Sequence, residues 1–215
     1  MNTILPQSSV LLVEGNDDKN VVIHLSARSG LDQNFKIIEK DGREPLLESI
    51  VIEARTPGRK NLGILLDADD DVNACWQAVK HRLDRLRLED QLELSKLPDQ
   101  PDPSGTIIEG PLRIGIWLMP DNCSSGELED FVESLIPSID PVWSLSDAYI
   151  EGIPPKIRKF SPGKIKRAKV HAWLATRERP RPMGQAIKTR DLDIEVASAT
   201  AFAGWLRELF RDSVQ

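Results

Sequence analysis

Acidic residues follow two apolar runs of this chain, and their types and spacing could bind a divalent cation. Glu14 comes directly after residues 10–13, and Asp67 and Asp69 come directly after residues 62–66. Each run has the length and apolar content of a buried strand. Oxygen ligands favour Mg²⁺ or Mn²⁺ over softer metals, and a group of carboxylates repels itself unless a cation lies among them. These residues therefore predict a metal-dependent chemistry on phosphate.

Strands and helices alternate through the first half of the chain. We expect strands at 10–13, 35–38 and 62–66, separated by helices at 17–29 and 44–53 and followed by a helix at 72–86. This order predicts an α/β fold, a Rossmann-like, mostly parallel sheet flanked by helices. Ligands of such sheets bind beyond the carboxyl ends of the strands. If the first and third strands are parallel neighbours, Glu14, Asp67 and Asp69 converge at one edge.

Other acids near these motifs have a simpler explanation. Asp17 and Asp18 fall in the first turn of the expected helix 17–29, where negative charge favours the helix dipole. The same explanation holds for Asp70 and Asp71 before the helix 72–86. We therefore expect Asp70 and Asp71 to be acids of a helix N-terminus rather than ligands.

The second half has a looser pattern. Residues 106–108 and 113–119 predict a hairpin or two strands near a sheet edge, and a helix is expected to begin at about Gly126. A basic helix is expected at 163–176, and a final amphipathic helix carries Phe202, Trp205 and Phe210. We divide the chain into an α/β core, residues 1–136, and a basic helical extension packed on it, residues 137–215.

Basic residues are concentrated in one segment of an acidic chain. Residues 1–155 hold 28 Asp and Glu against 14 Lys and Arg, whereas residues 156–190 hold 12 Lys and Arg against one acid, Glu178. Such a block favours a polyanion or an acidic partner. The alternative is a lid that neutralises the acidic body of its own chain.

The order strand–Glu-Gly, helix, strand, helix, strand–Asp-x-Asp resembles the Toprim domain of primases, topoisomerases, RecR proteins and OLD-family nucleases. The matching residues are Glu14 with Gly15, and Asp67 with Asp69, within a stretch of about residues 10–117. The resemblance implies that the Asp-x-Asp pair binds Mg²⁺ or Mn²⁺. It also implies that Glu14 contributes to the metal site or acts as a general acid or base.

A third acidic motif, residues 125–130, follows the expected strand 113–119. Together the motifs look like small OLD-nuclease-like Toprim proteins, and among OLD-like nucleases a further acid completes a two-metal site. Glu127 and Glu129 are the candidates here, and Asp121 is a third. Acids in the first turn of an ordinary helix explain the same pattern, so the choice stays open.

Lysines of the basic helix are the candidates for charge balance at the phosphate. OLD-like sites use a lysine near the metals, and Lys166 and Lys169 are our choice because residues three apart share a helix face. Alternatively Lys164, Lys166, Arg167 and Lys169 contact the backbone of a nucleic acid, DNA being the first candidate. His171 and Trp173 could stack on bases, but for Trp173 we rather expect that it packs its helix on the core.

The expected function is a metal-dependent nuclease. The alternative is a non-catalytic nucleic-acid-binding or regulatory subunit, like a RecR mediator or a phage-defence component, beside a separate ATPase. The chain has no Gly-x-x-x-x-Gly-Lys-Ser/Thr loop of its own. A receiver domain would carry adjacent acids after its first strand, and a haloacid-dehalogenase-like phosphatase would carry Asp-x-Asp there, so neither fits.

The composition limits where the protein is expected in the cell and which partners it is expected to have. The apolar runs are too short to span a bilayer, and the first nine residues lack the basic cluster and apolar stretch of a signal peptide. Cys75 and Cys123 fit neither a zinc pattern nor a disulfide framework, and Cys75 lies on an apolar stripe. We expect a cytoplasmic protein with no membrane partner that could form a homo-oligomer.

Overall fold

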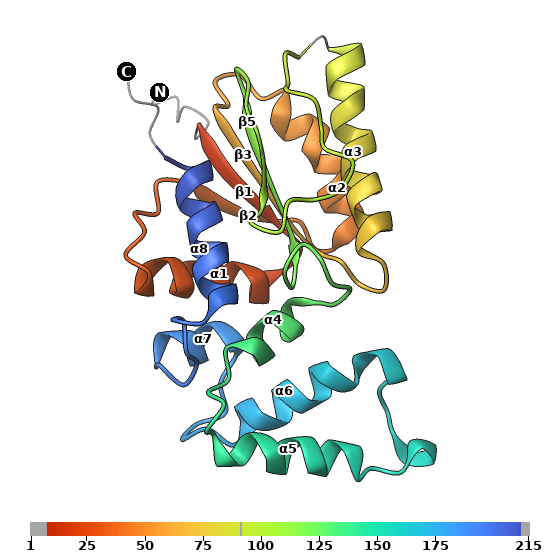
Figure 1. The fold of residues 1–215 in the computed structure, drawn as a ribbon, viewed down its shortest axis with the longest axis vertical. Coiled ribbons are helices and arrows are strands. Elements are labelled where there is room, and N and C mark those ends of the chain that lie inside the picture. The colour runs from red at the N-terminus through yellow and green to blue at the C-terminus, as the bar shows by residue number, and fades with distance from the viewer. Residues whose placement is uncertain (1–7, 91, 212–215) are drawn as a thin grey trace, which may run out of the picture.

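The computed structural model describes residues 8–90 and 92–211, which form a five-stranded sheet with helices on both faces (Figure 1). The strands stand in the order β2-β1-β3-β5-β4; all are parallel except β4, which pairs antiparallel with β5. Their bounds are β1 Ser9–Val13, β2 Lys36–Glu39, β3 Asn61–Asp67, β4 Thr106–Ile108 and β5 Arg113–Met119. The predicted α/β class with a mostly parallel sheet is confirmed.

Two of the helices, α3 and α5, begin at aspartates that cap them. The carboxylate of Asp71 accepts the N–H groups of Asn73 and Ala74 at the start of α3, which confirms its expected role. Asp140 caps α5 in the same way, and Pro141 follows it. The bounds are α1 Asn16–Arg28, α2 Arg43–Ala54, α3 Val72–Glu89, α4 Leu128–Ser134, α5 Pro141–Glu151, α6 Ile165–Ala175, α7 Met183–Lys188 and α8 Ala197–Leu209, with 3₁₀ turns at Pro155–Ile157 and Pro162–Lys164.

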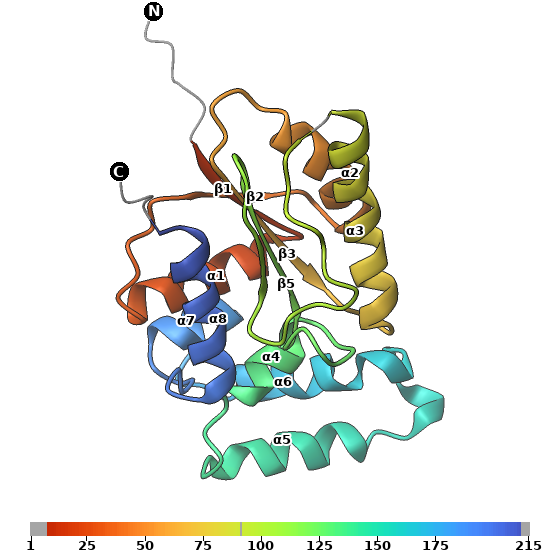
Figure 2. The same cartoon turned by 45° about the horizontal axis from the view of Figure 1, so that its top comes forward.

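Successive residues of each strand face opposite sides of the sheet, and this divides the core into two layers. On β1, Val10 and Leu12 pack with α2 and α3, whereas Leu11 and Val13 pack with α1 and α8. Figures 1 and 2 show these two pairs of helices on opposite sides of the sheet. Because both faces are buried, the central strands are continuous apolar runs rather than alternating ones.

The C-terminal helix α8 is one of the layers that cover the sheet. Leu209 lies so close to β3 and β5 that a Cβ at Gly63 or Gly115 would come within 3.0 Å or 2.5 Å of it. Phe210 stacks on Phe35 with ring centroids 3.9 Å apart. The region after residue 136 is therefore more than a basic addition, because its last helix shares the core of the first half.

The basic helix α6 forms a hairpin with α5 beyond the carboxyl ends of the strands, and α4 lies between this hairpin and the sheet (Figure 2). Trp173 on α6 is fully buried, which bears out its packing role. Among the described residues, none of the helices combines the length and the apolar character needed to cross a bilayer. The signal-peptide prediction concerns mainly residues 1–7, which lie outside the described residues.

Candidate functional site

The carboxyl ends of β1 and β3 bring Glu14 and Asp67 together. β1 and β3 are parallel neighbours, so the residue after β1 and the last residue of β3 share one edge. The carboxylate of Glu14 accepts a hydrogen bond from the backbone N–H of Asp67 at 2.9 Å. The carboxylate of Asp67 accepts one from the N–H of Leu128, the first residue of α4, at 2.9 Å. Backbone donors of two different elements, β3 and α4, thus fix the two acids.

Asp18 on α1 is a third acid at this edge, and the sequence analysis assigned it only to a helix start. Its side chain folds back and accepts the N–H of Gly15 at 3.0 Å. Asp18 is only 8% exposed and lines the same cavity as Glu14, Asp67 and Glu129. The spacing of four residues between Glu14 and Asp18 is the signal that could have found it, because a tight turn between them returns Asp18 to the edge.

Burial and mutual repulsion disfavour the charged forms of these acids. Burial, together with the carboxylates of Asp18, Glu14 and Glu129, raises the pKa of Asp67 to about 9. Burial and the neighbouring Glu14 raise the pKa of Asp18 to about 7, against the opposing hydrogen bond from Gly15. Burial also raises the pKa of Glu14, and Asp69 adds to the rise. A cation among these groups would restore their charged forms.

Asp69 lies two residues past β3 in a left-handed conformation, with φ of 53°. Its backbone exchanges two hydrogen bonds with Gly126, at 2.9 and 2.8 Å, and so ties the loop after β3 to the loop before α4. Its carboxylate accepts a hydrogen bond from Nη1 of Arg43 at 2.8 Å. Arg43, the first residue of α2, is a member of this site that the sequence analysis missed.

The acids that begin α4 face the basic helix α6. Glu127 precedes α4, and its N–H donates to the carboxylate of Asp130 at 2.8 Å. Glu129 is 4% exposed and lines the cavity of Glu14 and Asp67, whereas Glu127 lines a neighbouring cavity with Asp69. Although burial opposes it, the hydrogen bond from His171 and the charge of Arg167 lower the pKa of Glu129. Both acids also line a third cavity together with Asp69, so both belong to the site.

Asp121, the remaining candidate, lies in its own turn. Its carboxylate accepts the N–H groups of Cys123 and Ser124 at 3.0 and 2.7 Å, and the hydroxyl of Ser124 donates to it as well. It lines none of the cavities that Glu14, Asp67 and Asp69 line. The structure therefore does not bring Asp121 to the other acids.

Three cations near the start of α6 pair with acids near the start of α4. The pairs are Lys164 with Glu127, Arg167 with Glu129 at 3.0 Å, and Lys166 with Asp130 at 2.6 Å. The alternative considered from the sequence, a basic segment that neutralises the acidic body of its own chain, is thus present here.

Lys169 lies away from the acids of the sheet edge. Its ammonium group pairs with Asp147 and Glu151 of α5, each at 2.7 Å. Lys166 reaches Asp130, so the two lysines chosen from their shared helix face have different surroundings. Lys164, directly before α6, and Arg167, in its first turn, are the cations that the structure brings to Glu127 and Glu129.

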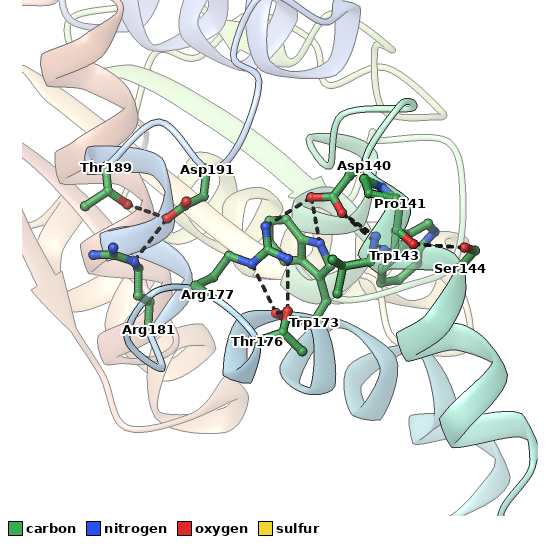
Figure 3. Close-up of polar contacts among 11 residues, drawn as sticks. Asp140, Pro141, Trp143, Ser144, Trp173, Thr176, Arg177, Arg181, Thr189 and Asp191 are labelled. Carbon is green, nitrogen blue, oxygen red and sulfur yellow. Dashed lines mark hydrogen bonds and ion pairs between the residues drawn. The ribbon is translucent and has the colours of Figure 1, made fainter.

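The opposite end of α6 is fixed to the start of α5 by a partly buried network (Figure 3). The carboxylate of Asp140 accepts hydrogen bonds from Nε1 of Trp173 at 3.1 Å and from Nη1 of Arg177 at 3.0 Å. The guanidinium of Arg177 also lies 4.0 Å from the centre of the Trp173 ring. This network therefore joins the start of α5 to the end of α6, the two points at which the hairpin connects to the rest of the chain.

Three cavities surround the acids. The largest, about 450 Å³, is lined by Arg43, Asp69, Glu127 and Lys164 among others. A second, about 390 Å³, is lined by Glu14, Asp18, Asp67, Glu129 and Arg167 among others. The third, about 230 Å³, adjoins α4 and α6. The acids are thus open to small molecules from both sides of the contact between α4 and α6.

The donor set suits a hard divalent cation, since every acid offers oxygen ligands. Among the residues that the structure describes, no three side chains of His, Cys, Asp or Glu already surround one point at metal-binding distance. Instead, three of the carboxylates form ion pairs with basic side chains: Asp69 with Arg43, Glu127 with Lys164 and Glu129 with Arg167. Metal binding at this edge therefore requires side-chain rotation that separates acids from their present cations.

The model of a family described as "Protein of unknown function (DUF3226)" matches residues 8–211, so the chain belongs to this family. No curated protein and no solved structure matches the chain significantly.

Proposed function

We propose that this DUF3226 protein is a Mg²⁺- or Mn²⁺-dependent phosphodiesterase that cleaves nucleic acid, with a Toprim-like site at the carboxyl edge of β1 and β3. The observation that carries the proposal is the meeting of Glu14, Asp18, Asp67 and Glu129 at one cavity, with the pKa of Asp67 raised to about 9. Grouped carboxylates with perturbed pKa values are typical of functional sites, because a fold without a use for them would avoid their mutual repulsion.

The residues of the chain have distinct roles in this proposal. Asp67 and Asp69 hold the cation, and Glu129 or Glu127 completes its ligand set. Glu14 binds a second ion or takes the proton of the attacking water, and burial, which raises its pKa, makes it a stronger base for that proton. A bound divalent cation would polarise the phosphate and lower the pKa of that water.

A comparison of matched aspartate variants tests this proposal. We expect purified protein to nick supercoiled plasmid with Mn²⁺ and not with EDTA. Asp67→Asn keeps the acceptor for the N–H of Leu128 but loses the charge, so we expect nicking at least about 100-fold slower. Asp84→Asn, on α3, is the control, because Asp84 pairs only with Arg87 among the described contacts.

Thermal unfolding gives a second measurement for the same proteins. Mn²⁺ should raise the Tm of the parent and of Asp84→Asn, but not that of Asp67→Asn, since a ligand stabilises the state that binds it. Equal nicking by all three proteins would point to a contaminating nuclease. A Tm that does not respond to Mn²⁺ would contradict the metal site.

The ion pairs at the candidate site favour a second candidate function. Arg43, Lys164 and Arg167 already neutralise Asp69, Glu127 and Glu129, as expected for a site that binds nucleic acid or metal without cleaving. The chain would then be a nucleic-acid-binding or regulatory subunit beside a separate ATPase. A Tm increase with Mn²⁺ and retention of DNA, without nicking by any of the proteins, would favour this candidate.

A further inference from the structure

Arg43 and Lys164 line one cavity of about 450 Å³ from opposite elements, α2 and the turn before α6. Asp69 and Glu127 line the same cavity and are their present partners. The cavity thus holds two cations and two acids, arranged in pairs, next to the acids of the sheet edge. Its volume is that of a small-ligand site.

Arg43 has donors to spare for an anion. Its Nη1 donates to Asp69 at 2.8 Å, and among the described residues no hydrogen bond from its Nε or Nη2 is recorded. A guanidinium has five N–H donors in a planar fork that matches two phosphate oxygens. Arg43 also begins α2, a helix of 12 residues, whose N-terminus attracts negative charge.

The backbone places Arg43 at this point. Gly42 before it has φ of 118°, a conformation that a residue with a side chain rarely adopts. The N–H of Gly42 donates to the carbonyl of Glu14 at 2.9 Å, which fixes the start of α2 to the end of β1. The start of α2, and with it the backbone of Arg43, is therefore fixed to the sheet edge.

A cation and a phosphate would each satisfy one half of these ion pairs. A divalent cation takes the carboxylates of Asp69 and Glu127, which releases Arg43 and Lys164. A phosphate group takes the two released cations. The cation displaces Arg43 and Lys164 from the acids and frees them for phosphate, and phosphate in turn frees the acids for the cation. Each ligand should therefore bind more tightly when the other is bound, and such coupling is reciprocal.

We propose that Arg43, opposite Lys164, binds a phosphate group of the substrate, and that this binding and divalent cation binding strengthen each other through exchange of the Arg43–Asp69 and Lys164–Glu127 pairs. The part that concerns the cation rests on the proposed function. The part that concerns phosphate stands on the cavity and its two cations alone.

Calorimetric titration with thymidine 3′,5′-bisphosphate tests the inference, since this probe carries phosphate but no scissile phosphodiester. We expect the full-length protein to bind it weakly in EDTA and about 5–150-fold more tightly with Mn²⁺, the usual range of coupling. Arg43→Gln and Lys164→Gln should each weaken probe binding at least about 10-fold, and each should bind Mn²⁺ alone as well as the parent or better.

Matched controls separate this outcome from a general loss of structure. Arg85→Gln and Lys80→Gln remove cations of α3 that pair with Glu89 and Asp99, outside the cavity, and should bind the probe as the parent does. Arg43→Lys should recover part of the affinity, and Tm should show that every variant is folded.

Several results would overturn the inference. If the parent does not bind the probe in either condition, or if the parent and both Gln variants bind it equally, Arg43 does not bind phosphate. If Arg43→Gln binds Mn²⁺ more weakly than the parent, Arg43 helps to position the acids for the cation instead of competing with it. If the parent binds no Mn²⁺ but binds the probe through Arg43 in EDTA, the proposed metal-dependent function fails while the phosphate site stands.

Discussion

The two ends of helix α6 both carry ion pairs, but the pairs differ in burial and in partners. Near its start, Lys166 and Arg167 are 58% and 50% exposed and pair with acids of α4 that border the candidate site. Near its end, Arg177 and Asp140 are each 12% exposed, and Trp173 stacks on the guanidinium. The acids are buried at both ends, so only the cations differ; we expect the second end to fix the hairpin and the exposed cations of the first end to exchange partners more readily.

Removal of Arg177 should have the largest effect on stability. Arg177→Ala leaves Asp140 partly buried without its cation, and we expect a loss of about 3–5 kcal/mol in the free energy of unfolding, measured with urea. Arg85→Ala, at an exposed pair on α3, is the control and should lose less than about 1 kcal/mol. If both variants lose equally little, the two kinds of ion pair do not differ.

The pH dependence of stability should distinguish the acids of the sheet edge. The pKa of Asp67 is raised from 3.8 to about 9 on folding, so between these values the folded state holds a proton that the unfolded state has released. Stability therefore falls as pH rises. Asp18, with its pKa raised to about 7, acts in the same direction up to that pH.

We expect Asp67→Asn to flatten this fall. Between pH 5 and 7 in EDTA, the parent should lose about 2 kcal/mol more than the variant, since one pKa unit corresponds to about 1.4 kcal/mol. Unfolding in urea at pH 5, 6 and 7 measures the difference. A steeper fall in the variant would mean that Asp67 is charged and stabilising in the folded protein.

The smallest effect is expected at the exposed end of α6. Lys166→Gln should change stability by less than about 1 kcal/mol, yet lower the salt dependence of DNA retention by about one unit, as for a lysine that contacts one phosphate. Lys169→Gln should leave that salt dependence unchanged, because Lys169 is held by Asp147 and Glu151. Equal changes in both variants would remove the distinction between the two lysines.

The fold was largely predictable because its signals are local. Apolar runs that end in acids marked β1 and β3, and the residues around Asp71 marked the start of α3. The role of α8 was not predictable in this way. Its contact with the sheet depends on Gly63 and Gly115, which leave room for Leu209. The positions of two glycines do not predict which helix, some 90 to 150 residues later, packs against them.

The candidate site was predictable only in part. The position of Glu14 and Asp67 follows from two parallel strands, and parallel neighbours must end at one edge. Asp18 looked like any acid of a helix start, and Arg43 like any exposed basic residue, since burial and pairing across elements leave no mark in the local sequence.

By itself the sequence determined that carboxylates gather at one edge of a parallel sheet and that a basic segment follows them, because chain order and side-chain type are sufficient for both. Only the tertiary structure decided which cations face which acids. Residues three apart on one helix, Lys166 and Lys169, have separate partners because α4 and α5 approach α6 from different directions. The pairing of charges is a property of how helices meet, and it is absent from the order of residues along any one of them.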